Sequence, residues 1–126
     1  LTATGGVISD YTSGSDVYRA HVFTSSGALN VITESYNSTF PNSIELLLVA
    51  GGGGASGGTG EPGGGGGAGA VIYKSSIPVS AQSYTITIGS GGAGGSGVNP
   101  GSGWGNNGGD STAFSLTADG GGAGGW

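Results

Sequence analysis

The chain has 126 residues, a formal net charge of −5 and no cysteine, so it allows one domain of ordinary size and excludes disulfides, thiolate metal sites and a catalytic thiol. Only two residues are basic, and no apolar run approaches the ~20 residues needed to span a bilayer. We therefore expect neither a nucleic-acid partner nor membrane insertion.

β-branched and aromatic residues mark the strands expected in the first fifty residues. Residues 17–24 (VYRAHVFT) and 29–33 (LNVIT) are predicted strands, and the Ser-Ser-Gly turn between them predicts a hairpin. Residues 44–50 (IELLLVA) form an apolar run without polar alternation after Glu45. This pattern indicates a central strand covered on both faces.

Glycine dominates the remainder of the chain. Of the 33 glycines, 29 lie in residues 51–126, which separates a β-rich N-terminal part (residues 1–50) from a glycine-rich part. Strands are predicted inside the second part at residues 70–74, 84–88 and 112–117. We expect the two parts to form one composite domain.

Six short strands without a helical period predict an all-β fold, a small antiparallel sandwich or jelly-roll-like module. The glycine-rich stretches follow strand-like segments, which would bring them to one end of this module. Flexible tethers are the default interpretation of such stretches. The alternative that we favour is a set of polyglycine II helices, whose backbone groups are free to bond laterally to neighbouring helices.

Several ordered segments resemble a known family. They are residues 3–6 (ATGG), 18–27 (YRAHVFTSSG), 44–54 (IELLLVAGGGG), 84–94 (YTITIGSGGAG) and 108–114 (GGDSTAF). The chain resembles the glycine-rich domain of bacteriophage tail-fibre, adhesin and related virion proteins. The resemblance implies a virion appendage, a homo-oligomer with trimers favoured, and loops between stacked polyglycine helices that touch the host surface. Such domains usually run on through further glycines beyond a point such as Trp126.

Trp104 is the main candidate for contacting a receptor. Glycines and Asn106 flank it, so its ring lacks local neighbours, and an aromatic face beside amides suits stacking on a sugar. Asn106, Asn107 and Glu61 are further candidates for contact with a bacterial surface glycan or outer-membrane protein. In the alternative interpretation Trp104, like Trp126, caps the glycine lattice or packs against a sister subunit.

Self-assembly has its own candidate residues. Leu46 and Leu48 lie on the apolar strand at residues 44–50, whose exposed edge could pair with another chain. Trp126 is the third candidate.

No pattern of residues indicates catalysis, a metal or a cofactor. His21 is the only histidine, and the sequence places no nucleophile and carboxylate beside it as a hydrolytic triad requires. The seven carboxylates show no acid/base spacing. Residues 106–110 (NNGGD) resemble half a calcium-binding repeat, but a turn is the better interpretation. We therefore expect a protein that is not an enzyme and binds no cofactor.

Three functions stay open. The first is a virion recognition domain that displays residues 55–62 and 96–107 to a bacterial surface. The second is a self-assembling subunit of an extracellular filament, or a particle-decorating protein. The third is an ice-binding polyglycine bundle, which ranks last because the glycine stretches show no sustained Gly-x-x period.

Overall fold

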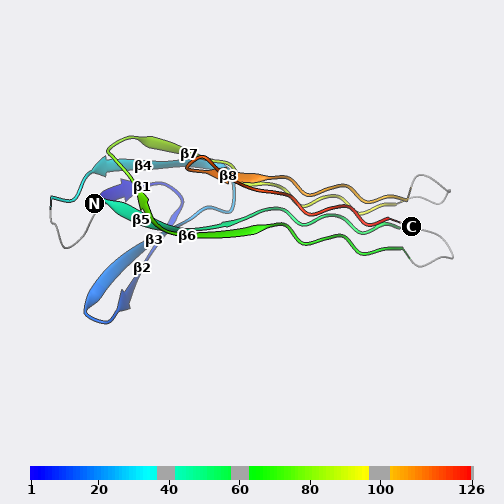
Figure 1. Ribbon diagram of the computed structural model, residues 1–126, viewed down its shortest axis with the longest axis horizontal. Helices are drawn as coiled ribbons and strands as arrows, with labels where there is room; N and C mark the ends of the chain where they lie inside the picture. The colour runs from blue at the N-terminus through cyan, green and yellow to red at the C-terminus, as the bar shows by residue number, and fades with distance from the viewer. Residues whose placement is uncertain (37–41, 58–62, 97–102, 126) are drawn as a thin grey trace.

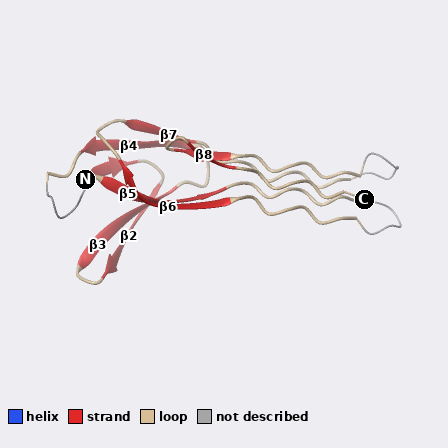
Figure 2. Ribbon diagram, viewed as in Figure 1, coloured by secondary structure: helices blue, strands red, loops and turns tan. Residues whose placement is uncertain are grey.

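The computed structural model describes residues 1–36, 42–57, 63–96 and 103–125 (Figure 1). This part of the chain is all-β and contains no helix that could cross a membrane. Figure 2 shows the strands gathered in a head, from which extended segments run side by side as a rod. The prediction of an all-β fold with small antiparallel sheets is confirmed.

Nine strands lie within the described residues of the head. They are β1 (Thr2–Thr4), β2 (Val7–Ser13), β3 (Asp16–Val22), β4 (Gly27–Thr33), β5 (Ser43–Val49), β6 (Val71–Pro78), β7 (Ser83–Ile86), β8 (Ser111–Ala113) and β9 (Leu116–Ala118). A three-stranded sheet has the order β1-β4-β7, and β2-β3, β5-β6 and β8-β9 are two-stranded ribbons. All pairs are antiparallel, and a bridge between Thr87 and Thr112 connects the three-stranded sheet to the β8-β9 ribbon.

The hairpin predicted between residues 17–24 and 29–33 is wrong. β3 pairs with β2 through a two-residue turn at Gly14 and Ser15, whereas β4 pairs with β1 and β7. Gly14 has a φ of 63°, the left-handed conformation that the first central residue of a type II′ hairpin turn requires. The Ser-Ser-Gly segment after β3 therefore connects two sheets.

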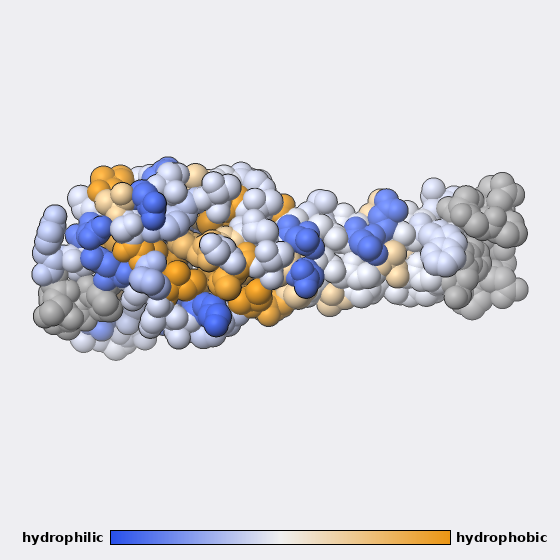
Figure 3. Space-filling view, turned by 45° about the horizontal axis from the view of Figure 1, so that its top comes forward, coloured by the Kyte–Doolittle hydropathy of each residue, from blue (hydrophilic) through white to orange (hydrophobic). Residues whose placement is uncertain are grey.

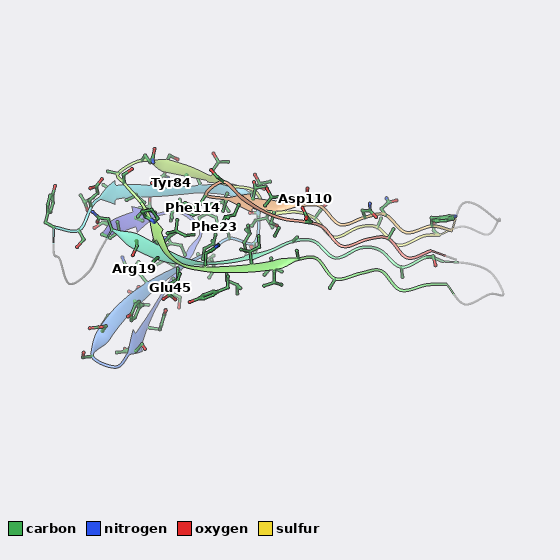
Figure 4. The ribbon with its side chains drawn as sticks, viewed as in Figure 1. Arg19, Phe23, Glu45, Tyr84, Asp110 and Phe114 are labelled. Carbon is green, nitrogen blue, oxygen red and sulfur yellow. The ribbon has the colours of Figure 1, made fainter. Side chains whose placement is uncertain are left out.

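Residues 112–117 form two short strands instead of the single strand predicted. β8 and β9 are joined at Phe114 and Ser115, whose φ angles of 51° and 61° match a type I′ turn. Such angles are costly without glycine. The Phe114 ring lies 4.7 Å from the Tyr84 ring, and this contact within the head helps to offset the cost (Figure 4).

β5 lies where the sequence predicts it but is not covered on both faces. Its only partner among the described strands is β6. Leu48 points into the core and is 3% exposed, whereas Leu47 is 65% and Val49 49% exposed. The prediction of a doubly covered strand is wrong because alternate side chains of this ribbon face outward despite being apolar.

The hydrophobic core is small and lies among the sheets of the head. Its buried apolar residues are Leu29, Val31, Leu48, Ala50, Val79, Ile86, Ala113 and Ala118. Phe23, Tyr84 and Phe114 pack against this cluster as partly buried side chains. Because no comparable cluster occurs in the described part of the rod, hydrogen bonds must hold the rod together.

Five glycine-rich segments form the rod. They are segment I (50–57), segment II (63–70), segment III (89–96), segment IV (103–110) and segment V (119–125). Sixteen backbone hydrogen bonds link them within the described residues. The N–H groups of residues 50, 53 and 56 donate to segment II, and those of 51, 54 and 57 donate to segment IV. This spacing of three residues is that of the polyglycine II helix.

Segment I is the centre of the rod. Besides donating to segments II and IV, it accepts bonds from segments III and V, so it contacts all four others. Segments II and V, V and IV, and IV and III are also bonded to one another. In a hexagonal packing this connectivity places segments II, I and III in one layer and segments V and IV in a second.

Glycine is required at every third position of these segments. A Cβ atom would overlap a carbonyl oxygen of a neighbouring segment at Gly51, Gly54 and Gly57 in segment I, and at Gly89, Gly92 and Gly95 in segment III. Between them, positions 55 and 93 are alanine, whereas a Cβ at Gly53 would also overlap a carbonyl oxygen, that of Gly122. The expectation that no Gly-x-x period is sustained is therefore wrong. The period was hidden because many intervening residues are also glycine.

Candidate functional site

The far end of the rod is the candidate recognition site. Gly57 N–H donates to Gly103 O at 2.7 Å, and Gly64 N–H donates to Gly125 O at 3.0 Å. The Ser56 hydroxyl also donates to Gly125 O, at 3.0 Å. These bonds gather the ends of segments I, II, IV and V, where the described residues flank 58–62 and 97–102. The site is therefore built from parts of the chain far apart in sequence.

Segment IV presents a line of large side chains toward segment V. Trp104, Asn107 and Asp110 share one direction because they are three residues apart. Asn107 Oδ1 accepts a hydrogen bond from Ala123 N–H and Asp110 Oδ1 accepts one from Gly120 N–H, both at 2.8 Å. Asp110 lies where the rod leaves the head (Figure 4). The two side chains thus pair backbone N–H groups that segment IV's own backbone does not reach.

Trp104 is the last member of this line toward the far end. Its side chain is 58% exposed. A Cβ built on Gly125 would lie 3.9 Å from the edge of its ring, in ordinary van der Waals contact. The ring therefore covers part of segment V and leaves more than half of its surface accessible. Both the contact and the capping interpretations of Trp104 are compatible with this position.

The structure describes two of the other three candidate contact residues, Asn106 and Asn107. Asn106 is exposed, and its backbone carbonyl accepts from Gly54 N–H while its N–H donates to Ala93 O. Asn107 is exposed but uses its side-chain oxygen within the rod. Glu61 lies outside the described residues, so its proposed contact stays a prediction.

The assembly candidates on β5 lie inside the head. Leu48 is buried in the core and Leu46 is packed against it, while Leu47 and Val49 occupy the exposed face of the strand. Trp126 lies outside the described residues. Side chains alternate between the two faces of a strand, so the accessible apolar residues of β5 are Leu47 and Val49. Sequence reasoning did not select these two residues.

The residues considered for chemistry have structural partners. His21 Nδ1 lies 2.8 Å from Gly5 O, and its ring is part-buried. Residues 106–109 do not form the predicted turn but lie extended within segment IV, where their spacing of three suits the rod. Within the described ranges, no three His, Cys, Asp or Glu side chains are grouped so that they could hold a metal ion.

Charged side chains with close partners lie on the two exposed ribbons of the head. The Arg19 guanidinium donates to both oxygens of Asp10, at 2.7 and 2.8 Å, and this hydrogen bonding lowers the pKa of Asp10. Tyr73 of β6 donates a 3.2 Å hydrogen bond to Glu45 of β5. The charge of Glu45 and this hydrogen bond raise the pKa of Tyr73. Tyr11 of β2 adds to the same shift. Figure 4 shows Arg19 on the β2-β3 ribbon and Glu45 close to its base.

Comparison with known protein families gives a match that covers the glycine-rich part of the chain. Residues 24–126 match a family model described as "Glycine-rich domain". No curated protein and no solved structure matches the chain significantly. The matched range contains β4 to β9 and the whole described rod, whereas β1, β2 and β3 precede it.

Proposed function

The chain belongs to the glycine-rich domain family, and on this premise we propose that it is a non-enzymatic recognition and structural domain of a phage virion, of the tail-fibre or adhesin type. In this role the head anchors the domain and the far end of the rod meets a bacterial surface glycan or outer-membrane protein. The virion location and the host contact come from the resemblance of the ordered segments to phage glycine-rich domains.

The far end of the rod is the structural observation that best supports this proposal. The rod holds the ends of its segments together at a point remote from the head, with Trp104 58% exposed beside them (Figure 1). An exposed tryptophan offers a large rigid surface with little rotamer entropy to lose on binding. Rigid backbone pairing behind it reduces the cost of ordering the contact surface.

A binding assay with matched aromatic variants tests the proposal. The fluorescently labelled chain is incubated with a panel of intact Gram-negative and Gram-positive cells and with an array of bacterial surface polysaccharides. We expect saturable binding to some of these probes and at least a tenfold loss of affinity in Trp104→Ala. Tyr36→Ala is the control, because Tyr36 is fully exposed but follows β4 in the head. Equal losses in both variants, or no binding to any probe, would count against the proposal.

A second candidate is a self-assembling subunit of an extracellular filament or a particle-decorating protein. The observation that favours it is the exposed apolar surface of the head, which Figure 3 shows as orange side chains continuing to the start of the rod. Light scattering and negative-stain electron microscopy separate the two candidates. Long ordered particles would favour the filament, and a compact species of fixed stoichiometry would favour the displayed domain.

A further inference from the structure

Two dipeptides prone to chemical rearrangement lie on facing segments of the rod, one on segment IV and one on segment V. Asn107–Gly108 is the only Asn-Gly pair in the sequence, and Asp119–Gly120 is the only Asp-Gly pair. The boundary between the two segments, here called the IV–V seam, is joined beside them by a 2.8 Å hydrogen bond from Gly108 N–H to Gly121 O. Asn107 and Asp119 are both exposed, so water reaches their side chains.

Deamidation of Asn107 uses the backbone nitrogen of Gly108 as its nucleophile. After this nitrogen loses its proton, it forms a bond to Asn107 Cγ, the bond from Cγ to the side-chain nitrogen breaks, and ammonia leaves. Water then opens the resulting succinimide at one of its two carbonyls, which gives aspartate or isoaspartate. In isoaspartate the main chain runs through the side-chain carboxyl and is longer by one methylene group. Glycine favours the first step because it places no side chain beside its nitrogen.

The folded rod opposes this first step at the nitrogen, at the backbone and at the side chain. The Gly108 N–H is bonded to Gly121 O, and this bond must open before the proton can leave, as in hydrogen exchange. Ring closure also requires Asn107 to leave the extended conformation of a polyglycine II helix, because its Cγ must approach the next nitrogen. The 2.8 Å bond from Ala123 N–H to Asn107 Oδ1 holds the side chain toward segment V.

The Asp-Gly pair is restrained in a similar way. Gly120 N–H donates to Asp110 Oδ1 at 2.8 Å, and a carboxylate acceptor opposes removal of the proton from this nitrogen. The carbonyl oxygen of Asp119 accepts the N–H of Ala70 at 2.8 Å, which fixes the same peptide group from its other side. In both dipeptides, therefore, the nitrogen that would attack is bonded across the IV–V seam. Protection at the two sites depends on the same contact between segments.

We propose that Asn107 is a deamidation site that the folded rod keeps inactive and that separation of segments IV and V activates. Isoaspartate at this position lengthens the backbone, so residues 103–106 move out of the three-residue register of the rod. Their hydrogen bonds to segments I and III then cannot re-form together. Opening of the IV–V seam becomes irreversible in this way, and the site limits the lifetime of the rod. This inference does not rest on the proposed recognition of a bacterial surface.

The protection is measured by ageing the unmodified chain in mildly alkaline buffer beside a synthetic peptide of residues 103–110. The peptide contains the same Asn-Gly pair but has no facing segment. Peptide mass spectrometry quantifies deamidation at Asn107, and enzymatic methylation of isoaspartate identifies the product. We expect deamidation of the folded chain to be at least tenfold slower than that of the peptide, because it must wait for local opening. Equal rates would overturn the proposal.

Matched alanine variants test whether the IV–V seam provides this protection. In Gly120→Ala the new Cβ would overlap Gly108 O and force segments IV and V apart beside Asn107. Gly122→Ala is the control in the same segment, because a Cβ there would have no neighbour within 4 Å. We expect Asn107 to deamidate at least tenfold faster in Gly120→Ala than in Gly122→Ala. The same rate in both variants would overturn the role of the seam.

The irreversible consequence has its own readout. Chains carrying isoaspartate are separated chromatographically, refolded and titrated with urea while tryptophan emission follows the rod. We expect them to lack the rod transition of the unmodified chain. Asn107→Asp should retain this transition, because aspartate keeps an acceptor oxygen for Ala123 N–H at the original backbone length. Isoaspartate chains that unfold at the midpoint of the unmodified chain would contradict the proposed loss of register.

Discussion

One added methyl group should destabilise the rod at some glycines and be tolerated at others. In Gly54→Ala the new Cβ would overlap Ala93 O and lie 2.9 Å from Gly92 O, so segment III must move away from segment I. This movement breaks the bonds Gly92 N–H to Gly52 O and Gly95 N–H to Ala55 O, both 2.8 Å long. At a net 0.5–1.5 kcal/mol each, the loss is about 1–3 kcal/mol.

The control is Gly65→Ala, where a Cβ would have no neighbour within 4 Å. Removing glycine there restricts only the unfolded chain and should stabilise the protein by about 0.4–1 kcal/mol. Urea titration followed by tryptophan emission measures both variants, because Trp104 lies in the rod. Equal midpoints for the two variants would refute the packing of the rod described above.

Three further outcomes follow from single side chains. Leu48→Ala should lower the free energy of unfolding by about 2–5 kcal/mol, whereas Leu47→Ala should change it by less than about 0.5 kcal/mol in thermal denaturation. Asn107→Ala removes the acceptor of an exposed backbone N–H and should lower the free energy of unfolding by about 0.5–1.5 kcal/mol in urea titration, while an exposed side chain without a structural role would cost nothing measurable. The hydrogen bond from Arg19 lowers the pKa of Asp10 in the folded chain. The stabilisation that this ion pair gives the hairpin is therefore complete above the pKa of the unfolded chain, ~3.9. It is lost as the pH falls through the lower pKa of the folded chain. NMR shifts of the stacked tyrosine rings should therefore change below about pH 4 in the native chain but not in Asp10→Asn.

The strands were predictable where composition and boundaries agreed. β5 is an apolar run ended by glycine, and β7 alternates Tyr84 and Ile86 inward with polar residues outward. Pairing was not predictable in the same way. Gly14 is a typical turn residue and lies between β2 and β3. However, β2 contains Asp10 and serines among its apolar residues, so its sequence resembles a loop. Residues 17–24 and 29–33 have a stronger strand pattern with a turn between them, which predicted that these two strands pair with each other.

The site was predictable only in part because its contacts cross between distant segments. Trp104 stands among glycines in the sequence, and its ring is 58% exposed in the rod. The role of Asn107 depends on the register between segments IV and V, which no local pattern defines. The spacing of Trp104, Asn107 and Asp110 by three residues was the available signal, and it becomes meaningful only once the period of the rod is known.

The direction of the hydrogen bonds in the rod has a mechanical consequence. They run between segments and across the long axis, and at ~3.1 Å per residue segment I extends for roughly 20 Å. A pull on the far end along this axis would load several parallel rows of bonds in shear at once, because no row can open before its neighbours slide. We expect the rod to resist tension far better than an equally small hydrophobic core would, as the proposed role in a virion appendage requires.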